Sequence, residues 1–364
     1  MDRRTLLKLS GAAAASAALP WKAAQASTTT GDWRSYEITT LVSIKEAKGI
    51  SRAWIPLPMT LDTEWQRSVG SNWSGNATKA QVYRDGKYGL SLLYAEWSEG
   101  IAQPSIQVVS SFQSRDRQVD PTKPVAGAEK LSAEEVSYYT AATEMIPTDG
   151  IVRDTARDIV KGARTDVEKA RRIYEWVVEN TFRDPKTKGC GWGDIKAMLE
   201  TRNLGGKCGD LNALFVGLSR SVGIPARDIY GLRVAPSIHG YKSLGVGAVN
   251  ITKAQHCRAE FFAQGVGWVP VDPADVRKVV LEEPPTNLKI DDPKVVAARK
   301  RLFGGWEMNW MAYNTAHDVA LPNAAGGPKI PYLMYVNAET GGERLDQLEP
   351  ERLVYEIRTN GVKA

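Results

Sequence analysis

The chain has 364 residues, of which 43% are hydrophobic and 24% are charged, and its formal net charge is +5. This composition is typical of a globular protein with about two domains. Three cysteines exclude a disulfide-rich scaffold and leave at least one thiol unpaired within the chain. Since no apolar stretch is long enough to span a bilayer, we expect no integral membrane segment.

Residues 1–26 have the pattern of an export signal rather than of a folded segment. Arg3 and Arg4 precede a short Ala-rich apolar stretch and a small-residue cleavage site at 24–26. The paired arginines resemble a twin-arginine signal, and an ordinary secretory signal is the alternative. We therefore expect a periplasmic or secreted protein that begins near Ser27. Without this leader the net charge is only +2, which gives no reason to expect nucleic acid as a partner.

Residues 27–125 are predicted to form a β-rich N-terminal domain. Apolar and polar residues alternate from 36 to 44, and Asp85-Gly86 is a hairpin signal between two further strand-like runs. The spacing favours an antiparallel β-sandwich-like domain. Three tryptophans are expected in its core: Trp54, Trp73 and Trp97.

Residues 126–290 are predicted to form an α+β core, and residues 291–364 a C-terminal extension that packs on the core or on the N-terminal domain. Capping-box matches at Ser132 and Thr165 each begin a helix, and the second helix is expected to end near Asn180. Strand-like runs follow at 227–234, 248–252, 255–262, 268–271 and 353–358.

Cys208 follows two glycines and precedes an amphipathic run that stops at Gly223. Five apolar residues recur in this run at helical spacing: Leu211, Leu214, Phe215, Leu218 and Val222. Cys208 is therefore expected in the first turn of a helix, where free N–H groups and the helix dipole stabilise a thiolate. Lys207 adds positive charge. The sequence thus predicts a nucleophilic cysteine, and a buried structural thiol is the alternative.

A cysteine nucleophile needs a base, and the base needs an orienting group. Of three histidines, His256 lies on the run 255–262. If this run forms a hairpin with 268–271, His256 and Asp272 become diagonal neighbours within side-chain reach. Pro270 then indicates that 268–271 is an edge strand or is irregular. The alternatives are a core histidine and an aspartate that begins a turn.

These segments together resemble a known family. The stretch from Gly206 through Cys208 to residues 223–227 is similar to the cysteine block of the bacterial transglutaminase-like superfamily. Residues 256–260 and 267–273 resemble its histidine and aspartate blocks, and residues 170–177 resemble the helix before them. The resemblance covers residues 150–280 well. It implies a papain-like core, in which the cysteine lies at a helix N-terminus packed on an antiparallel sheet.

The resemblance also implies a catalytic triad and a reaction. Cys208 would be the nucleophile, His256 the general base and Asp272 the residue that orients the imidazole. The expected enzyme is a cysteine peptidase or amidase that forms an acyl-enzyme with a peptide or protein substrate, and the cell envelope is the expected source of that substrate. Transfer to an amine by a protein-glutamine acyltransferase, or a non-catalytic envelope scaffold, is the alternative. No cofactor and no metal are expected, and the sequence does not indicate an oligomeric state.

Other residues near these blocks have less specific interpretations. The N–H of Cys208 is the expected oxyanion donor, and Gly206 and Trp192 are further candidates for oxyanion or substrate contact, although packing explains Trp192 more simply. Cys190 and Cys257 are expected to be inert or paired. Since neighbours on a strand alternate, Cys257 should face away from the site and Arg258 toward the face of His256.

A zinc site is the competing chemistry, because Cys190, Cys208, His256, Cys257 and Asp272 include the right ligand types. None of them shows the close spacing typical of zinc ligands. Glu260 is interpreted as a structural partner of Arg258 or Arg227. His239 and His317 are expected to be ordinary surface or core residues.

Overall fold

The computed structural model describes residues 28–29, 31–61 and 63–362, so the predicted export signal lies outside it. The helices are α1 (Ala133–Thr140), α2 (Gly150–Ile159), α3 (Asp166–Asn180), α4 (Ile195–Thr201), α5 (Cys208–Ser221), α6 (Pro273–Glu282) and α7 (Pro293–Arg301), with a 3-10 turn at Lys242–Leu244. The first strands are β1 (Thr28–Thr29), β2 (Arg34–Ile44), β3 (Ser51–Pro56), β4 (Gln66–Gly75), β5 (Lys79–Asp85), β6 (Leu90–Trp97), β7 (Ser105–Ser114), β8 (Arg117–Gln118), β9 (Phe182–Arg183) and β10 (Gly205–Gly206). The later strands are β11 (Ala226–Arg233), β12 (Gln255–Ala263), β13 (Gly267–Val271), β14 (Gly305–Trp306), β15 (Trp310–Asn314), β16 (His317–Val319), β17 (Ile330–Tyr332), β18 (Asn337–Thr340), β19 (Glu343–Arg344) and β20 (Leu353–Thr359).

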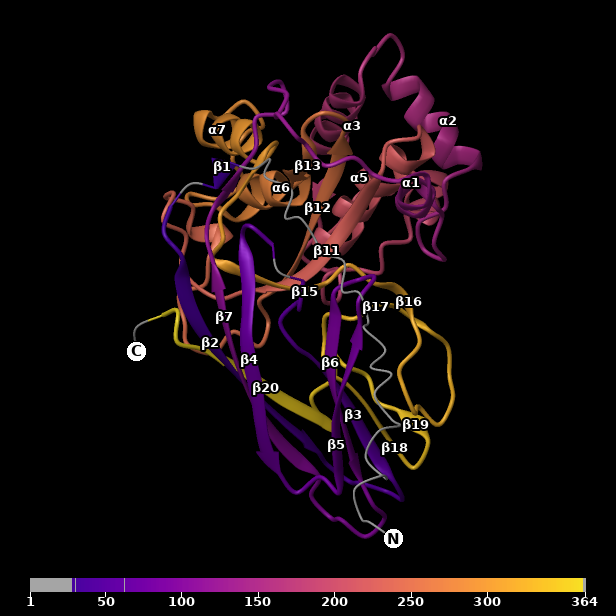
Figure 1. The fold of residues 1–364 in the computed structure, drawn as a ribbon, viewed down its shortest axis with the longest axis vertical. Helices are drawn as coiled ribbons and strands as arrows, with labels where there is room; N and C mark the ends of the chain where they lie inside the picture. The colour runs from indigo at the N-terminus through magenta and orange to yellow at the C-terminus, as the bar shows by residue number, and fades with distance from the viewer. Residues whose placement is uncertain (1–27, 30, 62, 363–364) are drawn as a thin grey trace, which may run out of the picture.

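Two antiparallel sheets form an elongated β-sandwich at one end of the molecule, and the helices gather at the other end (Figure 1). One sheet has the order β20-β2-β7-β4 and the other β19-β18-β3-β6-β5. Alternation along β2 buries every second residue, as its sequence predicts. This mixed architecture with antiparallel sheets confirms the predicted fold class.

The tryptophans of the sandwich divide into two groups. Trp97 is buried between the two sheets, and Trp54 is buried on the other face of β3, where its indole N–H donates to the carbonyl of Pro322 at 2.8 Å, so both are core residues as predicted. The prediction for Trp73 is wrong, because its side chain is 39% exposed. It lies on β4, which is an edge strand of its sheet, so fewer neighbours cover it.

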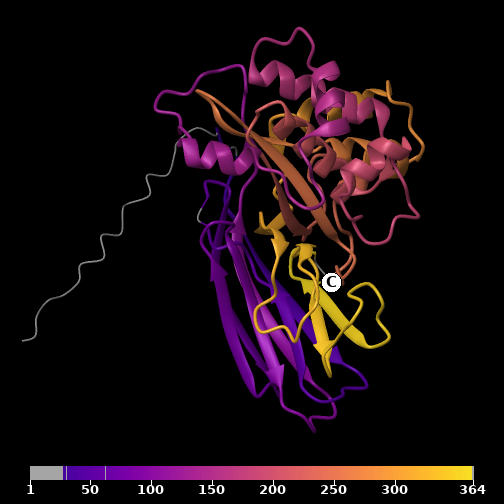
Figure 2. The ribbon, with the colours of Figure 1, turned by 90° about the vertical axis from the view of Figure 1, so that its right-hand side faces the viewer.

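Strands from the C-terminal part of the chain complete both sheets of the sandwich. β18 pairs with β3, and β20 pairs with β2 along seven residues, from Ile38↔Thr359 to Ile44↔Leu353. Figure 2 shows these C-terminal strands beside the sheets formed by the first part of the chain. The β-sandwich is therefore built from both ends of the described chain.

A third sheet, with the order β13-β12-β11-β15, forms the centre of the helical end. Helix α5 packs on it, with Phe215 against Phe261 at a ring separation of 6.3 Å. The apolar residues that predicted this helix are buried on several sides, because α2, α3 and α6 also contact it. The helix ends at Ser221, and Gly223 follows at a φ of +83°, which suits a residue without a Cβ.

The remaining sequence predictions have mixed outcomes. The capping box of α1 is confirmed. At α3 the side chain of Thr165 caps the helix, but the carboxylate of Glu168 accepts from the N–H of Arg164, so only half of the predicted box forms. Helix α3 ends at Asn180 as expected.

Residues 248–252 do not form the predicted strand. Asn250 makes an isolated bridge to Arg358, and its side-chain oxygen accepts from the N–H and hydroxyl of Thr252, which closes a turn. Within the described residues, no helix is both long and apolar enough to cross a membrane.

Candidate active site

Cys208 is the first residue of the central helix α5, as the sequence predicts. Its side chain is 3% exposed. Two residues later, the carboxylate of Asp210 accepts from the backbone N–H of Lys207 at 2.9 Å and from that of Gly193 at 3.0 Å. Asp210 thus holds the start of the helix against the glycine-rich loop 189–193. Gly191 has no room for a side chain there, since an added Cβ would lie 1.8 Å from a carboxylate oxygen of Asp210.

The hairpin that carries His256 has the predicted register. Phe262 pairs with Trp268 and Glu260 with Pro270, and β13 is an edge strand as Pro270 indicates. The Nε2 atom of His256 lies 2.7 Å from Oδ2 of Asp272. This hydrogen bond leaves Nδ1 as the imidazole nitrogen available to a thiol.

Asp272 is itself held in place by the helix that follows it. It is the N-cap of α6, where its Oδ1 accepts from the N–H of Asp275 at 3.0 Å. The amide of Asn212, on α5, donates to the same oxygen at 3.4 Å and to the carbonyl of Cys257 at 2.8 Å. The alternative that Asp272 and Pro273 begin a turn is replaced by a helix start. The carboxylate of Asp272, which caps this helix, faces the imidazole of His256.

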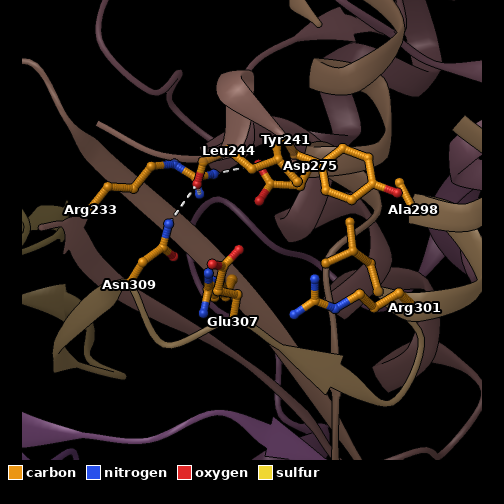
Figure 3. A pocket seen from close by; sticks show the side chains of 10 residues that line it. Arg233, Tyr241, Leu244, Asp275, Ala298, Arg301, Glu307 and Asn309 are labelled. Carbon is orange, nitrogen blue, oxygen red and sulfur yellow. Dashed lines mark hydrogen bonds and ion pairs between the residues drawn. The ribbon is translucent and has the colours of Figure 1, made fainter. Parts of the chain in front are cut away.

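A second buried carboxylate lies beside this pair. Oδ1 of Asp275 is 3.4 Å from Nε2 of His256 and 2.5 Å from Nη2 of Arg233. Figure 3 shows Arg233 directed at Asp275, next to a void of about 10 Å³ that Arg258 and Glu307 also line. The arginine neutralises Asp275. The imidazole therefore faces two carboxylates, and Asp272 is the one that has no strong ion pair with an arginine.

These charges set the protonation of the imidazole and of the thiol. Burial and Arg233 would lower the pKa of His256, but Asp275, Asp272 and the charge on Cys208 outweigh them and raise it above its ordinary value. For Cys208, a hydrogen bond from Cys190, another from Cys257 and the charge and hydrogen bond of His256 outweigh burial and bring the pKa well below its ordinary value. The site therefore favours a thiolate–imidazolium pair.

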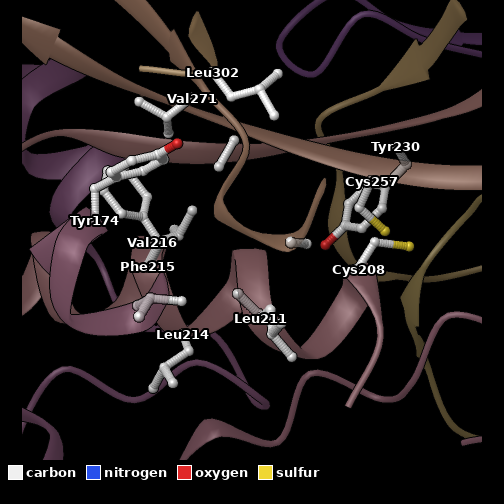
Figure 4. Packing of buried hydrophobic residues seen from close by; sticks show 14 of the residues in the cluster. Tyr174, Cys208, Leu211, Leu214, Phe215, Val216, Tyr230, Cys257, Val271 and Leu302 are labelled. Atoms are coloured by element: carbon white, nitrogen blue, oxygen red, sulfur yellow. The ribbon is translucent and has the colours of Figure 1, made fainter. Parts of the chain in front are cut away.

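All three cysteines of the chain meet at this point, and all three are free thiols. Their sulfur atoms lie within 4.8 Å of one another. Figure 4 shows Cys208 and Cys257 side by side at the start of α5, with the hydroxyl of Tyr230 next to them. The prediction that Cys257 faces away from the site is wrong, because α5 packs on the face of β12 that carries Cys257 and Phe261.

Two groups of side chains have the composition of metal ligands. One is the set of three thiols, which as soft ligands would suit a thiophilic metal. The other combines His256, Asp272 and Asp275, but the hydrogen bond between the first two and the ion pair of Asp275 with Arg233 already occupy its ligand atoms. In the first group, the thiol of Cys190 donates to the carbonyl of Gln255 and that of Cys257 to Sδ of Met334, so ligand atoms of both groups already have partners.

A cavity of about 560 Å³ opens onto Cys190, Cys208 and His256. Gly206 and Trp192 are not among the residues that line it. The packing interpretation of Trp192 is wrong, since its side chain is 63% exposed. Glu260 makes the structural ion pair with Arg227, at 2.5 Å, and a second one with Arg117 rather than with Arg258.

Several residues of the site were not predicted from the sequence. Asp275 had a signal, because Asp272, Pro273 and Asp275 form a helix start with a cap, a proline at the first position and an acid at the third. Asp210 had a similar signal, as an acid in the first turn of α5. Cys190 and Asn212 had none, because only the packing of distant segments brings them to Cys208.

Comparison with known proteins agrees with this geometry. Residues 153–273 match the family model described as the transglutaminase-like superfamily. An uncharacterized protein of Haemophilus influenzae is 36% identical over 342 residues, which cover 89% of this chain and 91% of that protein. The crystal structure of a candidate cysteine protease from Cytophaga hutchinsonii has the same fold with a TM-score of 0.53 and 12% identity, covering 91% of this chain and 99% of that one. The chain therefore belongs to the transglutaminase-like superfamily.

Proposed function

We propose that this protein is an exported cysteine hydrolase that cleaves peptide, isopeptide or related amide bonds through an acyl-enzyme on Cys208. One arrangement carries the proposal. Cys208 lies in the first turn of α5, the imidazole of His256 lines the same cavity and lowers the pKa of the thiol, and Asp272 is 2.7 Å from Nε2 of that imidazole. Export rests on the leader pattern of residues 1–26.

Acylation follows from the positions of these groups. His256 takes the thiol proton, and the sulfur of Cys208 forms a bond to the amide carbon while the carbonyl electron pair moves to oxygen. The N–H of Cys208 can donate to this oxygen, because an N–H in the first turn has no acceptor within the helix. His256 then returns the proton to the amide nitrogen as the carbon–nitrogen bond breaks, which leaves a thioester and a free amine.

Deacylation uses the same groups in the reverse roles. His256 takes a proton from water, whose oxygen attacks the thioester carbon. The carbon–sulfur bond then breaks, the thiolate is reprotonated and a carboxylic acid leaves. Throughout both steps Asp272 keeps the ring in one orientation and stabilises its positive charge. An amine in place of water would make the same enzyme an acyltransferase.

The first test measures the reactivity of Cys208 with alkyne-tagged iodoacetamide at pH 7, with the labelled residue mapped by mass spectrometry. We expect rapid labelling of Cys208 and a rate lower by about 100-fold in His256→Gln, because the imidazole no longer takes the thiol proton. His239→Gln is the matched control, since His239 lies outside the cavity and pairs with Asp116. Equal rates in His256→Gln and the wild type, with both proteins folded, would contradict the triad.

The second test looks for the reaction itself. The wild type and Cys208→Ala are incubated with peptides from a periplasmic extract in H₂¹⁸O, and new termini are identified by mass spectrometry. We expect new carboxylates that carry ¹⁸O with the wild type and none with Cys208→Ala. Products that appear only when an amine is added, and without ¹⁸O, would establish transfer instead. New termini that persist in Cys208→Ala would refute the proposal.

A further inference from the structure

The cavity at Cys208 has an unbalanced set of charges. Six cationic side chains line it and, among the residues that the structure describes, no carboxylate does. The six residues are Arg183, Lys188, Lys207, Arg233, Lys253 and Lys278. They come from β9, the residue before the glycine-rich loop, the N-cap of α5, β11, the turn before β12 and α6. The fold therefore assembles this charge from separate elements around the nucleophile.

Two of these cations compete for one carboxylate. Arg183 and Lys278 both form ion pairs with Glu282, one through each carboxylate oxygen. One positive charge is left over at this pair. Burial, followed by the charge of Arg183, lowers the pKa of Lys278 below its ordinary value in spite of Glu282. This is the response of an ammonium group that has more cationic than anionic neighbours.

Two further cations have no acidic partner. The Nζ atom of Lys207, next to the nucleophile, donates to the backbone oxygen of Thr187 at 2.7 Å. Lys253 is exposed in the turn three residues before His256. Neither lysine has a carboxylate within ion-pair distance among residues 28–29, 31–61 and 63–362. Both ammonium groups are therefore available to a ligand.

The other two cations contribute less. Arg233 is neutralised by Asp275 at 2.5 Å. Lys188 lies 3.5 Å from Glu349, and both side chains are more than half exposed, so solvent screens the charge of Lys188. Lys207, Lys253 and the Arg183–Lys278 pair therefore account for the excess charge of the cavity.

The cavity is also lined by neutral side chains. They include Leu348, Leu353 and Tyr355 from the C-terminal segment, together with Tyr335. A ligand in the cavity therefore meets apolar and phenolic surface as well as ammonium and guanidinium groups. An extended peptide can offer groups to both kinds of surface, because its side chains alternate in direction.

We propose that the cavity recognises an acidic peptide, whose carboxylates contact Lys207, Lys253 and the Arg183–Lys278 pair while an amide of the peptide reaches Cys208. This inference rests on the proposed function, since it names the substrate class of that site. Glu282 shows that Arg183 and Lys278 can hold a carboxylate. In a cavity partly closed to water, the excess charge acts on an anion more strongly than it would at an open surface.

The first experiment compares two alkylating reagents of similar size. Iodoacetate is an anion and iodoacetamide is neutral, and the ratio of their rates at Cys208 reports the potential in the cavity. We expect Lys253→Gln to lower this ratio by about threefold, and Lys207→Gln/Lys253→Gln by about tenfold. A change in the pKa of the thiol alters both rates equally and cancels in the ratio. Lys300→Gln, on the exposed side of α7, is the matched control and should leave the ratio unchanged.

The second experiment measures protection of Cys208 from iodoacetamide by two blocked peptides, acetyl-Ala-Glu-Glu-Ala-amide and acetyl-Ala-Gln-Gln-Ala-amide. We expect protection by the glutamate peptide alone. This protection should weaken in Lys253→Gln, and it should also weaken at about 0.5 M salt because the salt screens the charges of the cavity. Equal protection by both peptides, or protection by polyphosphate without protection by the glutamate peptide, would overturn the inference.

The outcomes separate this inference from the proposed function. If neither alkylating reagent reacts with Cys208, the proposed function fails. If Cys208 reacts rapidly in a His256-dependent way but the reagent ratio is the same in wild type and both lysine variants, only the inference about acidic peptides fails. Since Lys253 is exposed and makes no ion pair, Lys253→Gln is expected to fold as the wild type does.

Discussion

The sulfur of Cys208 lies beside two other thiols, and the three groups cannot all ionise together. The hydrogen bond to Cys208 is the first of the causes that raise the pKa of Cys190 well above its ordinary value. Burial, followed by bonds to the other two thiols, does the same for Cys257. Cys190 and Cys257 therefore stay protonated. The Cys190 thiol has the carbonyl of Gln255 as an acceptor at 3.3 Å, and the Cys257 thiol has Sδ of Met334 at 3.9 Å, so a thiolate at Cys208 competes with these neutral acceptors for each S–H. A thiol is a weak donor, but a charged acceptor strengthens the bond.

This arrangement predicts a role for Cys190 in positioning and tuning the nucleophile. Cys190→Ala removes the thiol that does most to lower the pKa of Cys208, so this pKa should rise toward its ordinary value. Less thiolate is then present at pH 6 to 7, and the rate of alkylation falls there while the plateau at high pH stays the same. The measurement is the pH profile of iodoacetamide labelling at Cys208.

Cys190→Ser is the matched variant, because a hydroxyl can donate in place of the thiol. We expect its profile to lie between those of the wild type and Cys190→Ala. A merely structural role for Cys190 would lower the rate at every pH without moving the midpoint. An unchanged midpoint in Cys190→Ala would therefore contradict this account.

The junction between the glycine-rich loop and α5 positions the nucleophile. Asp210 links the two elements through the N–H groups of Lys207 and Gly193. Gly209 tightens the same contact, since its N–H donates to the carbonyl of Cys190 at 2.8 Å and an added Cβ would lie 2.7 Å from that oxygen. The loop and the helix therefore place Cys190 and Cys208 together.

Asp210→Ala tests whether this junction matters for the site. Loss of two hydrogen bonds to a buried carboxylate should lower the free energy of unfolding by roughly 2 to 4 kcal/mol. We also expect slower labelling of Cys208, because the loop that carries Cys190 is no longer held. Thermal denaturation and labelling rates measure the two effects.

Asp194→Ala is the matched control for that variant. Asp194 caps the short helix α4 by accepting from the N–H of Ala197 at 3.0 Å. Its loss should cost about 1 kcal/mol of stability and leave the labelling rate at Cys208 unchanged. If both variants slow labelling equally, general destabilisation rather than the junction is the cause.

Elements with a local pattern were predictable from the sequence, and contacts between distant elements were not. The capping box of α1, the side-chain cap of α3, the start of α5 and the register of the His256 hairpin each depend on neighbouring residues, and each prediction is confirmed. Asp272 was predicted beside His256 for the same reason. The prediction from strand alternation was wrong for Cys257. Alternation tells which side chains share a face of the strand, but it does not tell which helix packs on that face.

The whole molecule is held together by strands from opposite ends of the described chain. β15 belongs to the central sheet, whereas β18 and β20 belong to the sandwich. Leu353 and Ile357, on β20, are buried. Since the sequence gives the strand run 353–358 but not its partner, the pairing of β20 with β2 could not be predicted. The sandwich and the core therefore share the same C-terminal segment.

This sharing predicts that the chain unfolds as one cooperative unit. Scanning calorimetry should give a single transition whose van't Hoff and calorimetric enthalpies agree. Removal of residues 353–364 should cost roughly 5 kcal/mol or more, because two buried apolar side chains and a ladder of hydrogen bonds are lost. Two separate transitions in the full chain, or a truncated chain with an unchanged midpoint, would contradict this prediction.

The pairing of Ile44 with Leu353 also has a consequence for biosynthesis. While the chain is being translated, the edge of β2 that will receive β20 has no partner, and an unpaired edge is prone to associate with other chains. Closure of a loop this long is also slow, since its entropy is lost before the strand pairs form. The joining of β20 to β2 therefore takes place only after Thr359 has been synthesised, and a chaperone that binds open strand edges would release the protein only at that step.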